Sequence, residues 1–230
     1  MSTDSIPGWV AFCGNVAPFA AIVVFLAPLP TIQQITKDRS VGSLPLLPYS
    51  SMVANCFLWF TYGLLKKEIR VWGTNGIGLL LALFYFMKFA RYAPLKSPTI
   101  PGSIRQHIQA TAMVVAGTFG IVYLSPITDP AAVIGNIAVL FCVAMFGSPL
   151  AALQTVLQTK SAKSIPLPFT LATVLNCLLW SIYGYWGMKD VNIYVPNLLG
   201  LGFGLAQVAL RVTFGDGNSL KSEQNLDLIA

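Results

Sequence analysis

Residues 55–63 read NCFLWFTYG, and residues 176–184 read NCLLWSIYG, so that a distinctive stretch returns 121 positions later. The same offset separates Gly14 from Gly135, and from Asn75 onward it becomes 122 after one inserted residue. A constant offset over so many rare residue types indicates an internal duplication. The sequence therefore predicts two copies of one structural unit.

The composition indicates that both copies lie in a membrane. The chain is 55% hydrophobic and only 10% charged, whereas soluble domains carry about 25% charged residues. About 20 helical residues, with a range of about 17 to 25, cross a hydrocarbon core ~30 Å thick. We therefore predict an all-α integral membrane protein with seven transmembrane helices. They correspond to the uncharged runs 6–36, 40–65, 71–87, 108–128, 130–159, 164–188 and 191–210.

The fourth run, 108–128, has no counterpart in the duplication. Three helices per copy is an odd number, so direct fusion would insert the second copy upside down, and one extra helix restores its orientation. The predicted fold is two parallel three-helix bundles joined by a linker helix, a 3+1+3 arrangement. The bundles are predicted at 8–93 and 129–214, with the linker and fourth helix at 94–128. The short polar segment 215–230 is predicted to be a disordered cytosolic tail.

The positions of the cations predict an orientation. Ten of the 14 Lys and Arg residues fall in loops on one side of the predicted membrane, which the positive-inside rule makes cytoplasmic. The N-terminus is then outside or lumenal and the C-terminus cytosolic. The net charge of +6 reflects this bias and requires no nucleic-acid partner. We expect the plasma membrane, with the vacuolar membrane as the alternative. The other side carries Lys66, Lys67, Arg70 and Lys189.

The seven runs contain no Asp, Glu, Lys or Arg. Proton relays are built from such groups, because a titratable side chain inside the membrane couples protons to transport. The one histidine, His107, lies at the head of the fourth run and is predicted to be interfacial, with a gate or proton site as the alternative. The sequence therefore predicts a facilitative carrier of a neutral solute. No metal-ligand spacing, phosphate loop or catalytic triad is present, so we expect no enzyme activity, metal or cofactor.

Two tryptophans and two asparagines are predicted to share a depth in the membrane. Counting from the nearest charged residues at 1.5 Å per residue, Trp59 and Asn75 lie roughly 8 to 10 Å below the outer face, and Trp180 and Asn197 roughly 10 to 14 Å. An amide offers both a donor and an acceptor to sugar hydroxyls, and an indole offers a flat apolar platform. These four residues are predicted to bind a sugar. Alternatively, the asparagines join helices and the tryptophans belong to an aromatic belt.

Other paired residues complete the predicted site. Cys56 and Cys177 lie one turn before the two tryptophans and are expected to line the same cavity. A proline removes a helical hydrogen bond and creates a site of bending. Paired prolines are therefore candidate hinges for alternating access, with plain helix kinks as the alternative. The pairs are Pro28 with Pro149, and Pro48 or Pro45 with Pro166.

At these residues the chain resembles the SWEET family of sugar transporters, whose bacterial relatives, the SemiSWEETs, are single three-helix repeats that dimerise. The resemblance covers about residues 8–214. It implies sugar uniport by alternating access, with the substrate near the bilayer midplane, as the parallel repeats of SWEETs place it. The motifs are Gly14-Asn15, Phe25-Leu-Ala-Pro28, Leu47-Pro48-Tyr49, Leu58-Trp59 with Tyr62-Gly63, Asn75-Gly76, Ser148-Pro149-Leu150, Thr159-Lys160-Ser161, Trp180 with Tyr183-Gly184, and Pro196-Asn197.

The resemblance also assigns roles to single residues. Asn75, Asn197 and Trp180 match substrate-binding positions, and the family's proline tetrad would fall on Pro28, Pro48, Pro149 and Pro166. Trp59 stands where many members have a smaller residue such as Ser. Two facing indoles should shrink the cavity, which predicts a monosaccharide such as glucose rather than sucrose. Val24 and Met145 match pocket positions that influence substrate size.

Partners and rival functions complete the expectations. The run Gly200-Leu-Gly202-Phe-Gly204 suits close helix packing within or between protomers, and we expect a homo-oligomer, or a hetero-oligomer with related transporters. A PQ-loop-like amino-acid exporter shares the seven-helix plan, but Pro28 and Pro149 are followed by Leu rather than Gln. A seven-helix receptor would bind ligand without flux. Rhodopsin-like receptors lack this duplication, and a receptor for charged peptide tails would need buried cations.

Overall fold

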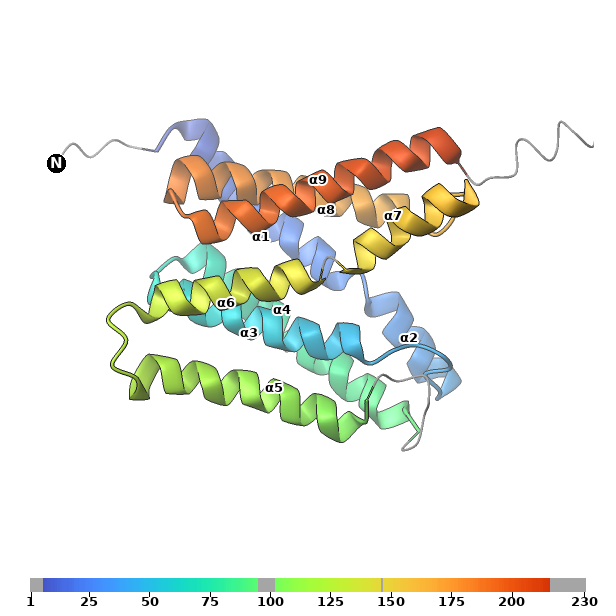
Figure 1. Cartoon of the computed structure of the whole chain (residues 1–230), viewed down its shortest axis with the longest axis horizontal. Helices are drawn as coiled ribbons and strands as arrows, with labels where there is room; N and C mark the ends of the chain where they lie inside the picture. The colour runs from blue at the N-terminus through green and yellow to red at the C-terminus, as the bar shows by residue number, and fades with distance from the viewer. Residues whose placement is uncertain (1–5, 95–101, 146, 216–230) are drawn as a thin grey trace, which may run out of the picture. The chain divides into compact units, whose positions relative to one another are not determined.

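The structure is a computed structural model that describes residues 6–94, 102–145 and 147–215. Every regular element in these ranges is helical, which confirms the predicted all-α class (Figure 1). The helices are α1 (Gly8–Leu26), α2 (Leu29–Asp38), α3 (Leu47–Leu65), α4 (Ile69–Tyr92), α5 (Ile104–Phe119), the π-helical η1 (Gly120–Leu124), α6 (Pro130–Met145), α7 (Gly147–Thr159), α8 (Leu167–Ile182), the π-helical η2 (Tyr183–Met188) and α9 (Val191–Phe214).

Most of the helices are built to cross a membrane. Within the described ranges, six helical stretches are long and apolar enough to do so. Two of these stretches each join two successive helices, α1 with α2 and α6 with α7. The stretches are Gly8–Asp38, Ile69–Tyr92, Ile104–Leu124, Pro130–Thr159, Leu167–Met188 and Val191–Phe214.

The seventh membrane helix is α3, which is long enough but less apolar than the others. It has 19 residues and no charge, but it contains Tyr, Ser, Asn and Thr side chains. Its buried residues include Tyr49, Ser50 and Tyr62, and it packs against both α4 and α5. Because neighbouring helices cover much of its surface, α3 carries polar residues that a lipid-facing helix would not.

The helices form two compact units. One consists of Met1–Ala20 and Val143–Ala230, and the other of Ala21–Cys142. The divisions fall within α1 and within α6, so that each of these helices contributes residues to both units. The tail predicted at 215–230 lies outside the described residues beyond Gly215, and so does most of the interrepeat linker before Gly102.

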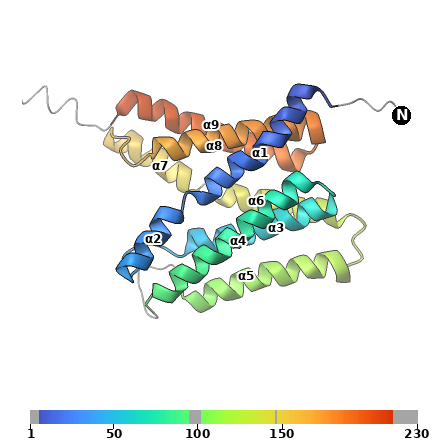
Figure 2. The same cartoon turned by 180° about the vertical axis from the view of Figure 1, so that it is seen from behind.

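The Ala21–Cys142 unit is organised around α3 and α4, which run side by side in both views (Figures 1 and 2). Its core joins α2, the loop that follows it, and both of these helices. The rings of Tyr49 and Phe89 lie 5.2 Å apart, and the Tyr85 hydroxyl donates a hydrogen bond to the carbonyl oxygen of Phe25 at 3.1 Å. The fully or nearly fully buried residues of the cluster are Ile32, Ile35, Val41, Leu46, Tyr49, Tyr85 and Phe89.

The other unit is organised around α8 and α9, which also run side by side (Figure 1). The end of α9 is fixed to the loop between α7 and α8. The Arg211 guanidinium donates to the carbonyl oxygen of Ala162 at 3.0 Å, and the Ala162 N–H donates to the carbonyl oxygen of Gly215 at 2.9 Å. Leu210 and Phe214 pack against the buried residues of this loop region. The last turn of α9 is therefore held by both polar and apolar contacts.

Two successive helices of each copy form a hairpin, α3 with α4 in the first copy and α8–η2 with α9 in the second. Each hairpin contains a glycine at the same position of the duplicated sequence, Gly63 or Gly184. A Cβ atom on Gly63 would lie 2.5 Å from the backbone nitrogen of Trp72. A Cβ atom on Gly184 would lie 2.8 Å from Ile193 Cγ2 and 3.0 Å from the backbone nitrogen of Tyr194. Glycine permits such close approach of two backbones. The glycine of the repeated Tyr-Gly pair is thus explained by the short distance between the backbones of the two helices in each hairpin.

Replacing Gly63 by alanine should separate the ends of α3 and α4, because the new methyl group meets backbone atoms that cannot move independently. We expect a loss of about 1 to 3 kcal/mol of unfolding free energy, which lowers the unfolding midpoint in detergent by about 2 to 4 °C per kcal/mol. The matched control is Gly117→Ala, because a Cβ atom there meets nothing within 4 Å. Equal midpoints for Gly63→Ala and Gly117→Ala would contradict the close-approach explanation.

Candidate functional site

The two predicted sugar-binding asparagines occupy the same register in their helices. α4 begins after Glu68, whose carboxylate accepts a hydrogen bond from the Arg70 N–H at 3.2 Å. α9 begins after Asp190, whose carboxylate accepts one from the Asn192 N–H at 3.0 Å. Each acid is therefore an N-cap that satisfies a backbone donor of the first turn. Asn75 and Asn197 each lie seven residues beyond their cap, about two turns into the helix.

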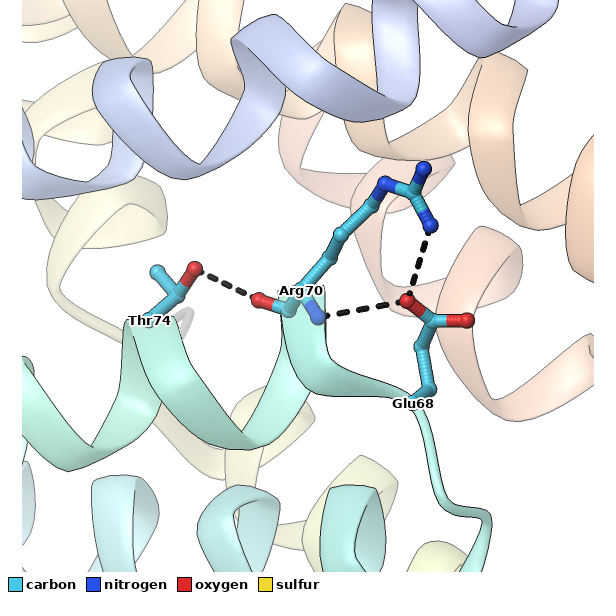
Figure 3. A network of polar contacts seen from close by, with 3 residues as sticks. All are labelled: Glu68, Arg70 and Thr74. Atoms are coloured by element: carbon cyan, nitrogen blue, oxygen red, sulfur yellow. Dashed lines mark hydrogen bonds and ion pairs between the residues drawn. The ribbon is translucent and has the colours of Figure 1, made fainter.

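The cap of α4 has a second role, which Figure 3 shows. Glu68 Oε1 also forms an ion pair with Arg70 Nη1 at 3.2 Å. The Thr74 hydroxyl donates to the carbonyl oxygen of Arg70 one turn further along (Figure 3). The start of the helix that carries Asn75 is thus held by one carboxylate that binds both the backbone and a side chain.

Both asparagine amides make the same local contact. Asn75 Nδ2 donates to the carbonyl oxygen of Val71 at 2.9 Å, and Asn197 Nδ2 donates to that of Ile193 at 2.7 Å. These bonds lie within one helix, and both side chains are half-buried. Each bond uses one of the two amide N–H groups, so it leaves the amide oxygen and the second N–H available to a polar ligand.

The side chains of the two tryptophans are buried. Trp59 is 8% exposed and Trp180 is 7% exposed. Each indole contacts the tyrosine one turn later edge-on or nearly so: Trp59 with Tyr62 at 5.5 Å, and Trp180 with Tyr183 at 6.3 Å between ring centroids. The tyrosines themselves are almost completely buried. The repeated Trp-x-x-Tyr-Gly pattern therefore builds the same aromatic pair in each copy.

A thiol that the sequence analysis did not assign contacts one of these indoles. Trp59 Nε1 donates to Cys142 Sγ at 3.3 Å, and Cys142 Sγ lies 3.3 Å from Asn55 Oδ1 as its donor. These bonds join α3 to α6. Asn55 could have been noticed, because it returns as Asn176, but Cys142 corresponds to Ala21 in the other copy. Comparison of the copies therefore gives no signal for this cysteine.

The four residues predicted to line the pocket differ in their burial. Val24 is half-buried in α1, and Cys56 is completely buried in α3. Met145, the last residue of α6, is 39% exposed, whereas Cys177 in α8 is buried. Each unit holds one member of every predicted pair. The Ala21–Cys142 unit contains Val24, Cys56, Trp59 and Asn75, and the other unit contains Met145, Cys177, Trp180 and Asn197.

The predicted hinge prolines lie at helix interruptions or helix starts. Pro28 lies between α1 and α2 as the N-cap of α2. Pro149 is the third residue of α7, which begins just after the end of α6, and its side chain lies outside the described residues. Pro48 is the second residue of α3, and Pro166 is the N-cap of α8. A proline at a helix start costs no hydrogen bond, so its effect is to fix where the helix begins.

Within residues 6–94, 102–145 and 147–215, no group of three or more His, Cys, Asp or Glu side chains has a metal-binding arrangement. The amides and indoles predicted from the sequence are groups that suit a neutral ligand with hydroxyl groups.

Comparison with known proteins identifies relatives of this chain. The sequence model of a family described as sugar efflux transporters for intercellular exchange matches twice, over residues 11–97 and 132–216. The bidirectional sugar transporter SWEET12 of Oryza sativa subsp. japonica is 32% identical over 208 residues, which cover 89% of this chain and 67% of that protein. SWEET7b of the same organism is 31% identical over 233 residues, 99% of this chain and 85% of that protein. A solved eukaryotic SWEET transporter superposes with a TM-score of 0.78 at 28% identity, over 89% of this chain and 96% of that one.

Removal of the α4 cap should destabilise the helix that carries Asn75. Glu68→Ala leaves the Arg70 N–H without its acceptor, and we expect a loss of about 1 kcal/mol of unfolding free energy, seen as a lower unfolding midpoint in detergent. Glu68→Asp should retain most of the stability, because Asp190 performs the same role at the equivalent position. The capping account fails if both variants unfold at the wild-type temperature, or if Glu68→Asp is as unstable as Glu68→Ala.

Proposed function

The chain belongs to the SWEET family of sugar efflux transporters for intercellular exchange, and from this we propose that it is a facilitative, proton-independent uniporter for a monosaccharide such as glucose. The observation that carries the proposal is the double family match, one over each copy of the duplication. Sugar transport across a membrane, without enzyme activity, follows from this membership and from the likeness to several bidirectional sugar transporters. The coupling and the choice of sugar are proposed from the residues of this chain.

Proton independence is proposed from where the titratable groups lie. Helices α3, α6, α7 and α8 contain no Asp, Glu, Lys, Arg or His. The charged residues of α2 and α9 lie in the last turn, and those of α4 lie in the first turn (Arg70) or among the last five residues (Lys88 and Arg91). A proton-coupled carrier requires a titratable group along its substrate path. This distribution favours a uniporter over a proton-coupled amino-acid exporter.

Sugar binding is proposed to involve the paired residues of the two copies. Asn75 and Asn197 would bind hydroxyl groups with the amide oxygen and the N–H not used by their own helices. Trp59 and Trp180 would stack against the C–H faces of the ring. Val24, Cys56, Met145 and Cys177 would set the size of the pocket. Alternating access would use bending at Pro28, Pro48, Pro149 and Pro166.

The placement in the cell and the assembly are proposed from the sequence. We propose that the N-terminus lies outside or in a lumen and the C-terminus in the cytosol, because cations concentrate on one side. The plasma membrane is the proposed location. The division into bundles at 8–93 and 129–214 with a linker at 94–128 remains our proposal, as does a homo-oligomeric state.

Alanine substitution of either asparagine should strongly reduce glucose transport. In proteoliposomes, we expect Asn75→Ala and Asn197→Ala each to lower glucose uptake by about tenfold, which corresponds to roughly one sugar hydrogen bond. The matched control is Thr155→Ala, because this exposed residue also donates to the carbonyl oxygen four residues earlier. It should transport glucose at the wild-type rate.

A pH gradient should leave wild-type glucose uptake unchanged, because no Asp, Glu, Lys, Arg or His lies in the middle of the described helices. Uptake is compared in the same vesicles with and without an imposed gradient. Flux that follows the gradient would contradict proton independence. The absence of flux for any sugar, with flux of an amino acid or binding without flux, would instead favour the exporter or the receptor.

The indole of Trp59 should restrict the size of the sugar. We expect the wild-type protein to transport glucose faster than sucrose. Trp59→Ala should raise the ratio of sucrose to glucose uptake, since it removes one of the largest side chains from the pocket. Trp9→Ala is the control, because Trp9 is 53% exposed at the start of α1. Equal wild-type rates for the two sugars would contradict the monosaccharide preference.

A further inference from the structure

Cys142 of α6 holds two polar side chains of α3 at once. Its sulfur accepts a hydrogen bond from Trp59 Nε1 at 3.3 Å and lies 3.3 Å from Asn55 Oδ1. An indole N–H can only donate and an amide oxygen can only accept, so the thiol must accept from Trp59 and donate to Asn55. The thiol has one hydrogen to give, and this arrangement uses it.

These contacts restrict the Trp59 ring. Asn55 and Trp59 are four residues apart and therefore lie on the same face of α3. Cys142 binds the nitrogen of the indole from another helix, while Tyr62 packs against the ring edge-on at an interplanar angle of 90°. The side chain is 8% exposed. With its N–H bound and its ring packed against Tyr62, the indole has one preferred orientation.

The second copy of the repeat lacks this arrangement. Asn55 and Trp59 return as Asn176 and Trp180, but the position that matches Cys142 is Ala21, which has no polar atom in its side chain. Asn176 Oδ1 is buried and has no hydrogen-bond partner among the described residues. The Asn55 amide oxygen is therefore satisfied by the thiol, whereas the equivalent amide oxygen of Asn176 is unsatisfied among the described residues.

We propose that Cys142 is a positioning residue for sugar binding, which holds the Trp59 indole in the orientation that a sugar ring stacks against. The inference rests on the proposed function, because it assumes that Trp59 contacts the sugar. The thiol acts through Trp59 and does not itself bind the ligand. Its presence in one copy alone makes the two indoles different: Trp59 is held by a side-chain hydrogen bond from another helix, and Trp180 has no equivalent thiol.

The first test compares substitutions of Cys142 by glucose uptake in proteoliposomes. Cys142→Ala should raise the KM for glucose about fivefold, the effect of losing one neutral hydrogen bond, and leave the maximal rate per folded protein unchanged. Cys142→Ser keeps a donor and an acceptor and should retain a KM near the wild-type value. Cys13→Ala is the control. A purely structural role would lower the amount of folded protein without changing the KM.

A double-mutant cycle then asks whether the effect passes through Trp59. In the Trp59→Ala background, Cys142→Ala should produce no further change in the KM. The proposal is overturned if Cys142→Ala has the wild-type KM, or if its effect is the same in the presence and absence of the indole, since the thiol would then act directly.

A variant that fails to fold and a wild-type protein that does not transport glucose have different consequences for the proposal. If Cys142→Ala does not reach the membrane, Cys142→Val replaces it, because valine is similar in size and can neither donate nor accept. A wild-type KM for that variant likewise overturns the proposal. Absence of glucose flux in the wild-type protein would overturn the proposed function, and this inference with it.

Discussion

A chain that crosses a lipid bilayer must satisfy its backbone N–H and C=O groups within its own helices, because hydrocarbon offers no hydrogen-bond partners. Every place where a helix begins, ends or breaks is therefore costly and needs a local solution. Pro28 lies at the break between α1 and α2, and Glu68 and Asp190 cap the starts of α4 and α9. Because these solutions are built from single residues, duplication carried them into both copies. The equal distance from cap to asparagine in α4 and α9 is a direct result.

The same constraint governs the polar side chains. Asn75 and Asn197 reduce the cost of burial by donating to a carbonyl oxygen of their own helix, and the threonines of α4, α5 and α8 do likewise. Asn55 instead reaches a thiol on another helix. A polar group that is satisfied locally keeps its remaining hydrogen-bonding capacity for a ligand, whereas one that is satisfied between helices fixes their packing. The two kinds of contact thus separate proposed binding from proposed positioning.

Features that single helices specify could be predicted from the sequence, whereas contacts between helices could not. The helices and the paired asparagines are specified locally, by uncharged runs and by motifs that recur at a fixed offset, and the family comparisons agree with the fold and with sugar transport. The polar character of α3 was visible, but its burial depends on α4 and α5. The Trp59–Cys142 contact joins residues 83 positions apart, and Cys142 has no counterpart in the other copy. A pattern of repeats cannot reveal a contact that only one copy makes.

The difference between the copies has a physical reason if the ligand is a sugar. In both hairpins the following helix passes close to the backbone of the preceding one, so a glycine is required at Gly63 and at Gly184. A sugar ring has no two-fold symmetry, so the proposed function does not require the side chains of the two copies to be identical. Selection can then retain the glycines, caps and tyrosines as pairs while Cys142 and Ala21 diverge. On this view, positions such as Cys142 and Ala21, which neither backbone spacing nor helix capping fixes, are the ones free to differ between the copies.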